Sequence, residues 1–176
     1  GQSDLLRFIR DFETHVATKH AGIIDLRFNW GGNVHDRVLQ ILSRKIYSFW
    51  QIRGMARWKQ PFYPAPRKAM AMLINERSLS DAEMTTNGFK SLGLGTLVGI
   101  PTYRWIIFTS SKSLLGGRGM RVPFWACRST DGKDLEKTGV EPDIRVRNTF
   151  ADRLHDRDPQ LQKTVDFLLL KLQKKK

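Results

Sequence analysis

The chain has 176 residues, of which 40% are hydrophobic, and both values are typical of one globular domain with a real core. No apolar run approaches the roughly 20 residues of a membrane-spanning helix, and the N-terminal residues lack the pattern of a signal peptide. The 30 basic residues against 17 acidic ones give a net charge of +13, which raises nucleic acids, acidic peptides and anionic surfaces as partners. The single cysteine, Cys127, excludes an internal disulfide and weakly supports a reducing compartment.

Helical spacing of apolar residues predicts a first helix that begins at Ser3 or Asp4 and ends at Gly22. The run 23–28 is short and mostly apolar, as in a strand buried on both faces. A tight turn at 29–33 follows, and the next apolar stripe predicts a second helix. Three prolines further along then predict an extended connection.

The central prediction is a buried strand, a polar turn and a helix. The strand spans Ala69–Ile74, and the helix begins at Ser80 and stops at Gly93. A hydroxyl at this position can lie beside free backbone N–H groups and the positive end of a helix dipole, which suits a nucleophile whose attack creates an oxyanion. The alternative is that Ser80 only caps the helix, which is the commoner role of such a serine.

After a further strand at 96–100, the pattern changes to short strand candidates at 103–109, 120–127 and 144–146. Cys127 is predicted to be a packed strand residue rather than a nucleophile. A final helix begins at Asp158-Pro159, and its predicted buried face consists of Leu161, Val165, Leu168, Leu169 and Leu172. Helices that alternate with buried strands favour an α/β layered fold with a parallel sheet, in one domain over 1–176.

Metal and nucleotide chemistry have little support in the sequence. The four histidines have no metal-ligand spacing, and each is predicted to be a surface residue: His15, His20, His35 and His155. The glycine turn lacks the lysine and the third glycine of a phosphate-binding loop. A glycine pair can nevertheless present bare N–H groups to an oxyanion, a use that needs no lysine. No metal and no cofactor are expected.

Basic and aromatic residues are interleaved from Arg37 to Lys68, and no Asp or Glu interrupts them. Basic groups track phosphates and aromatic faces stack on bases, so this segment is the best feature for a nucleic-acid-binding module. No recognition motif accompanies the charge, and we therefore favour a solvated basic face over a buried aromatic row. Nucleic acid is accordingly not the expected partner.

Six stretches carry a resemblance to a known family, from about Gly22 to Leu172. They are IIDLRFNWGG (Ile23 to Gly32), LINERSLSDAE (Leu73 to Glu83), LGLGTLVGIPT (Leu92 to Thr102), LLGGRGMRVP (Leu114 to Pro123), LEKTGVEPDIRV (Leu135 to Val146) and DPQLQKTVDFLL (Asp158 to Leu169). In this order they are similar to the C-terminal catalytic domain of the tricorn proteases, in the tail-specific (C-terminal processing) serine peptidase superfamily. One stretch alone would be weak evidence for the family, but six stretches in the same order are strong evidence.

The resemblance implies a crotonase-like (ClpP-like) layered α/β core with a mostly parallel sheet and flanking helices. It implies that Ser80 is the nucleophile, that the N–H groups of Asp81 and of Gly31 or Gly32 form an oxyanion hole, and that Glu136 completes a charge network. It further implies a cytoplasmic, homo-oligomeric, prokaryotic peptidase that acts on peptides or unfolded polypeptide, without a membrane partner.

This sequence departs from the family pattern in ways that affect the mechanism. The family's catalytic histidine lies upstream of a PDZ-like domain, so we expect this chain to be a fragment that lacks both and does not hydrolyse peptides alone. Relatives with a Ser-Lys dyad carry lysine where Trp105 falls, and Arg104 before it cannot act as a general base because an arginine side chain stays protonated in proteins. The Ser-His arrangement is therefore the better match.

Two further departures concern substrates. Arg104-Trp105 replaces an expected Gly-Gly, which changes the shape of the substrate groove, and the family's acidic specificity residue has no equivalent around Trp50-Gln51. We therefore do not expect this chain to share the tricorn preference for basic residues before the cleaved bond. The alternative hypothesis from another class is a catalytically silent domain that binds peptide or serves as a scaffold for an oligomer.

Overall fold

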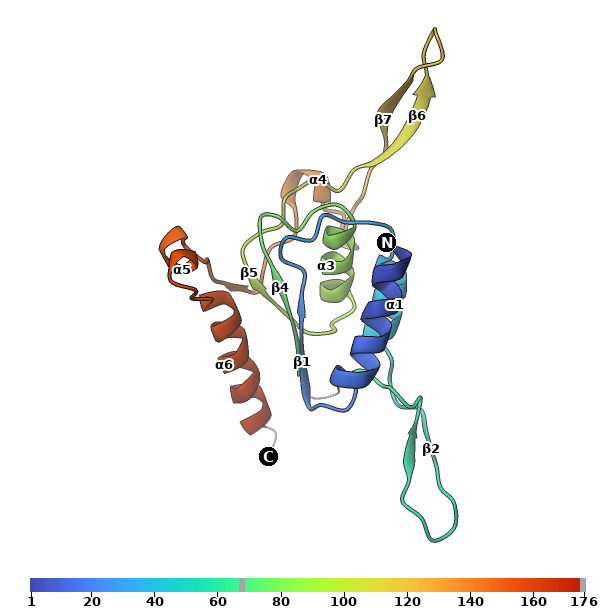
Figure 1. Cartoon of the computed structure of the whole chain (residues 1–176), viewed down its shortest axis with the longest axis vertical. Coiled ribbons are helices and arrows are strands. Elements are labelled where there is room, and N and C mark those ends of the chain that lie inside the picture. Colours follow the sequence, from blue (N-terminus) through green and yellow to red (C-terminus); the bar gives the residue numbers. More distant parts are fainter. Residues whose placement is uncertain (67–68, 175–176) are drawn as a thin grey trace.

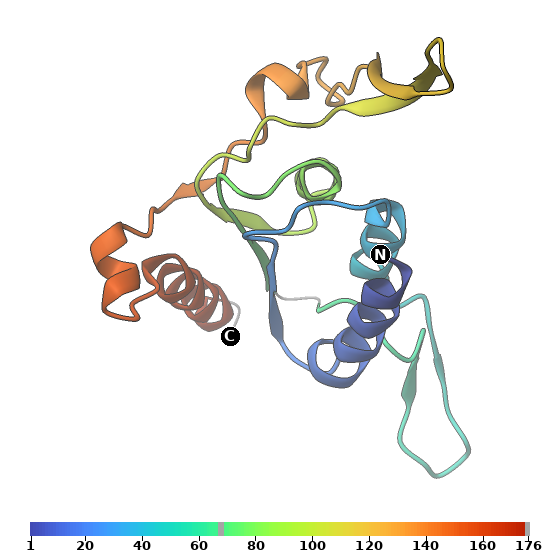
Figure 2. The same ribbon diagram turned by 45° about the horizontal axis from the view of Figure 1, so that its top comes forward.

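The computed structural model describes residues 1–66 and 69–174, so Arg67 and Lys68 of the predicted basic segment lie outside the described residues. Four parallel strands form the central sheet, in the order β1 (Ala21–Asp25), β4 (Ala69–Ile74), β5 (Thr96–Gly99) and β8 (Ile144–Arg145). Helices flank the sheet on both sides (Figures 1 and 2). The predicted α/β fold with a mostly parallel sheet is confirmed, whereas the crotonase-like label stays a prediction.

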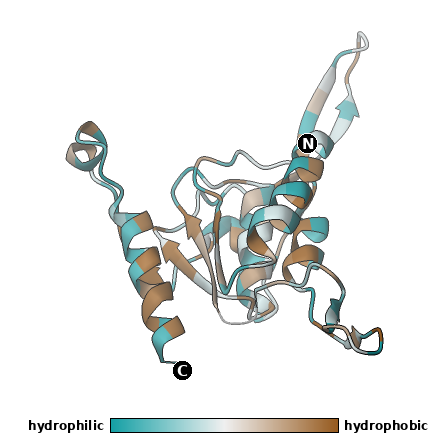
Figure 3. Cartoon of the chain, turned by 60° about the horizontal axis from the view of Figure 1, so that its bottom comes forward, coloured by the Kyte–Doolittle hydropathy of each residue, from teal (hydrophilic) through white to brown (hydrophobic). Residues whose placement is uncertain are grey.

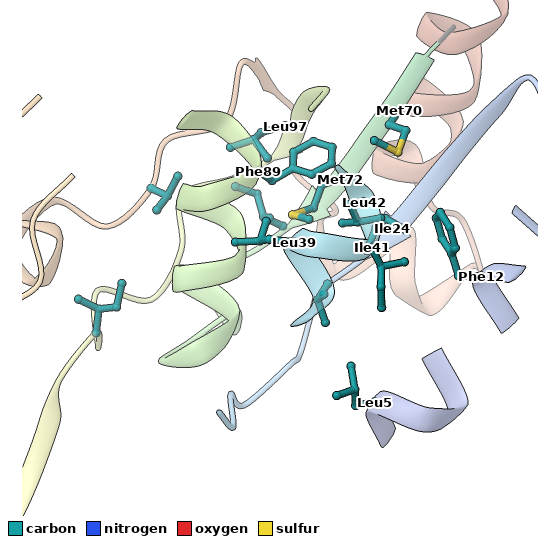
Figure 4. Packing of buried hydrophobic residues seen from close by; sticks show 14 of the residues in the cluster. Leu5, Phe12, Ile24, Leu39, Ile41, Leu42, Met70, Met72, Phe89 and Leu97 are labelled. Atoms are coloured by element: carbon teal, nitrogen blue, oxygen red, sulfur yellow. The ribbon is translucent and has the colours of Figure 1, made fainter. Parts of the chain in front are cut away.

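Side chains of β4 alternate between two helical layers, as the pleat of a strand requires. Met70, Met72 and Ile74 lie in the larger core cluster, which α1 (Gln2–Asp11), α2 (His35–Leu42) and α3 (Asp81–Ser91) help to form. Figure 4 shows Met70 and Met72 in this cluster. Ala69 and Ala71 point the other way and pack with Leu168 of α6 (Pro159–Gln173). The strand is buried along its whole length, as predicted from its apolar run.

The first helix ends earlier than the predicted position at Gly22, which lies instead within β1. One π-helical segment, η1 (Phe12–Val16), follows α1. A Cβ atom on Gly22 would lie 2.8 Å from Cγ1 of Val16. The glycine therefore allows the end of the helical segment to pack closely against the strand, rather than ending the helix itself.

Two antiparallel hairpins extend from the body of the molecule (Figure 1). They are formed by β2 (Ser48–Trp50) with β3 (Trp58–Gln60), and by β6 (Phe108–Ser113) with β7 (Gly119–Trp125). The first hairpin lies in the basic segment, where the predicted buried aromatic row is wrong because these side chains are exposed: Tyr47, Phe49, Trp50 and Phe62. Before the second hairpin, residues 103–107 form a loop instead of the predicted start of a strand.

The C-terminal helix α6 packs on the sheet through a face that only partly matches the predicted one: Leu168 is buried as predicted, and Val165 and Leu172 are half-buried. Gln160, Thr164 and Leu168 are its buried residues, whereas Leu161 and Leu169 are exposed. The amide of Gln160 donates a hydrogen bond to the carbonyl of Val146 at 2.9 Å, which fixes this face toward the end of β8. Hydrophobic residues dominate the central strands and also occur on the outer side of α6 (Figure 3).

Two short helices, α4 (Leu135–Thr138) and α5 (Phe150–Leu154), lie on either side of β8 in the chain. Cys127 follows β7 and is partly buried, with its Sγ 3.2 Å from Sδ of Met84. Burial raises the pKa of this thiol above its ordinary value. Within the described residues, no helix has both the length and the apolar character needed to cross a bilayer.

Arg27 connects the end of β1 to the start of α6. Its guanidinium lies 2.7 Å from Oδ2 of Asp25 and 2.8 Å from Oδ1 of Asp158, and its side chain is only 11% exposed. Burial by itself would raise the pKa of Asp158, but hydrogen bonds from Arg27, Asn148 and the N–H of Leu161 outweigh burial and hold that pKa at about 2.

We expect Asp158→Asn to destabilise the fold at neutral pH and to have little effect in strong acid. The pKa of Asp158 in the folded state lies below the unfolded value of about 3.9, so its stabilisation is present above pH ~4 and is lost as the pH falls through ~2. Urea unfolding followed by circular dichroism from pH 7 to pH 2 measures the difference between variant and wild type. Asp166→Asn, at an exposed position of α6, is the control. A stability difference between Asp158→Asn and wild type that stays constant down to pH 2 would contradict the lowered pKa of Asp158.

Candidate functional site

Ser80 lies in the turn between β4 and α3 with a strained backbone. Its φ is +57° and its ψ is −119°, values that residues other than glycine seldom adopt. It occupies the N-cap position of α3, where its carbonyl accepts the N–H of Glu83 at 2.9 Å, and within residues 1–66 and 69–174 its hydroxyl makes no hydrogen bond. Ser80 therefore stands at the strand-to-helix transition, as predicted, without the hydrogen bond on which a purely capping role depends.

Ser78, the other serine of the turn, has a structural role. It is fully buried, and its hydroxyl accepts a hydrogen bond from the N–H of Asn75 at 3.0 Å. The same hydroxyl donates to the carbonyl of Leu26 at 2.9 Å. These contacts fasten the turn to the end of β1, so Ser78 is not available in the way that Ser80 is.

A buried carboxylate that the sequence analysis did not assign to the site organises the turn. Oε2 of Glu83 accepts hydrogen bonds from the N–H of Ser80 at 3.0 Å and of Trp105 at 2.8 Å. Oε1 accepts from the hydroxyl of Thr102 at 2.7 Å and from the N–H of Arg104 at 2.8 Å. The serine and glutamate spacing of a helix start was visible in the sequence, but the contacts with the loop 102–105 had no local signal.

The glycine turn between β1 and α2 packs directly against Ser80. Gly31 has a φ of +93°, and a Cβ atom there would lie 2.8 Å from Cβ of Ser80 and 2.9 Å from the backbone nitrogen of Asp81. The N–H of Gly31 donates to Oδ1 of Asn29 at 2.9 Å. Within residues 1–66 and 69–174, the N–H groups of Gly32 and Asp81 donate no hydrogen bond. The structure thus places Gly31 against Ser80 and Gly32 beside the carboxylate of Asp81, and the N–H groups of Gly32 and Asp81 stay available as donors within the described residues.

The side chain of Asp81 fixes the glycine turn to the start of α3. This carboxylate is 4% exposed, and its Oδ2 accepts a hydrogen bond from the N–H of Val34 at 2.8 Å. Its Oδ1 is hydrogen-bonded to Nδ1 of His35, whose side chain is 15% exposed. The prediction of a surface histidine is therefore wrong for His35, and it holds for the other three histidines, which are exposed: His15, His20 and His155.

We expect His35→Ala to lower the free energy of unfolding by about 1–3 kcal/mol, because a buried oxygen of Asp81 loses its partner. Urea denaturation of the chain measures the change. His20→Ala removes an exposed histidine and should stay within about 0.5 kcal/mol of the wild type. His35→Asn retains a donor and should recover part of the loss. Equal urea midpoints for His35→Ala and His20→Ala would show that the contact contributes nothing.

Glu136, the predicted member of a charge network, lies on α4 with its side chain exposed. Its backbone N–H donates to Oδ1 of Asp134 at 3.2 Å, and within the described residues its carboxylate forms no hydrogen bond with Ser80. The structure does not bring these two residues into contact, so the role of Glu136 stays a prediction. Residues 1–66 and 69–174 also contain no group of three or more His, Cys, Asp or Glu side chains that could hold a metal ion.

Comparison with known proteins assigns the chain to a family. Residues 1–146 match the model of peptidase family S41. The chain belongs to peptidase family S41. Among S41-like relatives, tricorn protease homolog 1 of Streptomyces coelicolor is 32% identical over 168 residues, which are 93% of this chain and 15% of that protein. The tricorn protease of Thermoplasma acidophilum is 31% identical over 174 residues, which are 98% of this chain and 16% of that protein.

Solved structures agree with the S41 assignment. The crystal structure of the tricorn protease matches with a TM-score of 0.84 at 29% identity, over 98% of this chain and 17% of that one. The photosystem II D1 C-terminal processing protease matches with a TM-score of 0.61 at 20% identity, over 83% of this chain and 39% of that one, which shows a shared fold. The resemblance read from the six motifs is confirmed. The chain spans only 15% to 16% of the tricorn proteins from Streptomyces coelicolor and Thermoplasma acidophilum.

Proposed function

We propose that this S41 domain is the catalytic domain of a serine peptidase and that Ser80 attacks the peptide carbonyl. The observation that carries the proposal is the backbone of Ser80, at φ +57° in a strand-to-helix turn, with a hydroxyl that makes no hydrogen bond to any described residue. Strained turns of this kind expose a nucleophile and place backbone N–H groups beside the oxyanion that its attack creates.

In this proposal the oxyanion hole consists of the N–H groups of Asp81 and Gly32. The N–H of Asp81 is the first of α3, where helix geometry leaves it without an intrahelical acceptor. The sequence left Gly31 and Gly32 as alternatives, and the hydrogen bond from Gly31 to Asn29 favours Gly32. Gly31 then contributes by close packing against Ser80, which holds the turn at the required distance.

The proton of the Ser80 hydroxyl needs a base, which the proposal assigns to a histidine outside this chain. His35 is committed to Asp81, and the other three histidines are exposed. An upstream histidine next to a PDZ-like domain, as in the sequence prediction, would supply the base, and Glu136 on α4 would pair with it. General-base assistance is typically worth ~100- to 10,000-fold, so the chain alone should be nearly inactive.

The proposed substrates are peptides or unfolded polypeptide. Self-association and a cytoplasmic location are also part of the proposal. Exposed apolar side chains on the two hairpins support self-association, for example Trp50, Leu115 and Trp125. The single cysteine gives weak support for a reducing compartment.

A fluorophosphonate probe tests the proposal, because such probes react with an activated hydroxyl beside an oxyanion hole. In the full-length protein encoded by the gene, mass spectrometry should map the label to Ser80, and Ser80→Ala should abolish it. Ser91→Ala, at an exposed position of α3, should keep the label. A label on Ser78 would contradict the assignment. A folded full-length protein that carries the upstream histidine and takes no label would favour the silent peptide-binding scaffold.

A further inference from the structure

A cavity of about 620 Å³ opens beside the turn that carries Ser80. The loop residues Thr102, Tyr103 and Arg104 line one part of it, and Arg145 and Arg147 line another, at the end of β8. Glu76 is the acidic side chain in the same lining. Three guanidinium groups therefore share this space with one carboxylate, and we call it the arginine cavity.

Short hydrogen bonds attach the arginine cavity to the nucleophile turn. The N–H of Tyr103 donates to the carbonyl of Ser78 at 3.0 Å. The N–H of Arg104 donates to Glu83, whose other carboxylate oxygen accepts the N–H of Ser80. Arg104 has a φ of +74°, so its backbone is held in the left-handed region as that of Ser80 is. The backbone of Arg104, from which its side chain extends, is consequently fixed close to the turn that carries Ser80.

The guanidinium groups of the arginine cavity are open to a ligand. Arg145 lies 3.3 Å from Glu141 in an exposed ion pair, which holds it weakly. In the part of the chain that the structure describes, no ion pair engages Arg104 or Arg147. Arg27, in contrast, is nearly buried between two carboxylates and has no such freedom.

We propose that the arginine cavity binds a carboxylate of the peptide substrate within a few residues of the scissile bond. Planar guanidinium groups bind carboxylates through paired hydrogen bonds, and the net charge of +13 attracts acidic peptides to the surface. The carboxylate comes from an Asp or Glu side chain or from a free C-terminus. This inference rests on the proposed peptidase function and adds a substrate class to it.

Binding to the Ser80→Ala variant of the full-length protein tests the inference without hydrolysis. Fluorescence anisotropy compares labelled peptides of one neutral, amidated sequence with versions that carry one Glu at successive positions, and with the same neutral sequence ending in a free carboxylate. We expect one acidic version to bind about tenfold more tightly than the neutral peptide, and its identity gives the source of the carboxylate. Equal affinities for all the peptides would overturn the inference.

Variants then locate the binding site. The double variant Arg145→Gln/Arg147→Gln should remove the roughly tenfold preference and leave the affinity for the neutral peptide unchanged. Arg104→Lys keeps the charge but not the planar group, and it should lose part of the preference. Arg37→Gln, at an exposed position of α2, should keep it. A double variant that is folded by circular dichroism and retains the preference, or that weakens both peptides equally, would overturn the inference.

The outcomes also separate this inference from the peptidase proposal. An acidic preference that depends on Arg145 and Arg147, in a protein whose Ser80 takes no fluorophosphonate label, supports the carboxylate site and contradicts the nucleophile assignment. A labelled Ser80 together with equal binding of acidic and neutral peptides supports the nucleophile assignment and contradicts the carboxylate site.

Discussion

Glu83→Gln is expected to lower the free energy of unfolding by about 3 kcal/mol and to slow fluorophosphonate labelling of Ser80 about 100-fold. The carboxylate of Glu83 is fully buried and accepts four hydrogen bonds. Each carboxylate oxygen accepts two of these bonds in the wild type, but the glutamine amide has only one oxygen. Its NH₂ group therefore faces two donors that lose their acceptor. Buried donors without acceptors cost about 1–3 kcal/mol each, and the turn relaxes away from its strained geometry.

Urea denaturation of the chain and the labelling rate of the full-length protein measure the two effects of Glu83→Gln. Glu141→Gln is the matched control, because Glu141 is an exposed carboxylate in a surface ion pair with Arg145. Its removal should change stability by less than about 1 kcal/mol and leave labelling unchanged. If Glu83→Gln behaves like this control, the buried carboxylate does not shape the nucleophile turn.

The second large effect is expected for Gly31→Ala, which should slow labelling of Ser80 by about 100- to 1,000-fold. The new Cβ atom would stand 2.8 Å from Cβ of Ser80 and 2.9 Å from the backbone nitrogen of Asp81. Both distances are shorter than any normal contact, so the glycine turn must move away from α3. The N–H of Gly32 moves with it, and one donor of the proposed oxyanion hole is lost.

Gly54→Ala separates the clash from backbone strain. Gly54 has a φ of +81°, but a Cβ atom there would meet nothing within 4 Å. This control should lose about 1–2 kcal/mol of stability through its dihedral angle and keep its labelling rate. If the two variants lose labelling to the same extent, close packing of Gly31 on Ser80 is not the reason for the glycine.

Elements with a strong local pattern could be predicted from the sequence. Ala69–Ile74 forms β4, and α3 ends before Gly93, because an apolar run and a glycine decide those features locally. The orientation of α6 could not be predicted in the same way. Its apolar stripe correctly placed Leu168 against the small side chains of β4, but the hydrogen bond from Gln160 accompanies a rotated face that leaves Leu161 and Leu169 exposed.

The site shows the same division between local and distant information. Ser80 and the glycine turn were visible as motifs at strand-to-helix transitions. Glu83 reaches Thr102 across 19 residues, and His35 reaches Asp81 across 46 residues, so neither contact leaves a signal in the nearby sequence. The prediction that the aromatic residues of the basic segment are buried was wrong for a related reason. These residues lie in or next to a projecting hairpin, which exposes both of its faces.

The parallel arrangement of the sheet has a consequence for synthesis on the ribosome. β8 pairs with β5 across more than 40 residues of chain, and α6 covers the alanine face of β4 only after residues 159–173 have emerged. Long-range pairings of this kind fold slowly, and an uncovered apolar face of the sheet can recruit other chains. The nascent domain is therefore open to aggregation until its C-terminal helix is released, and a premature stop before α6 would leave it permanently so.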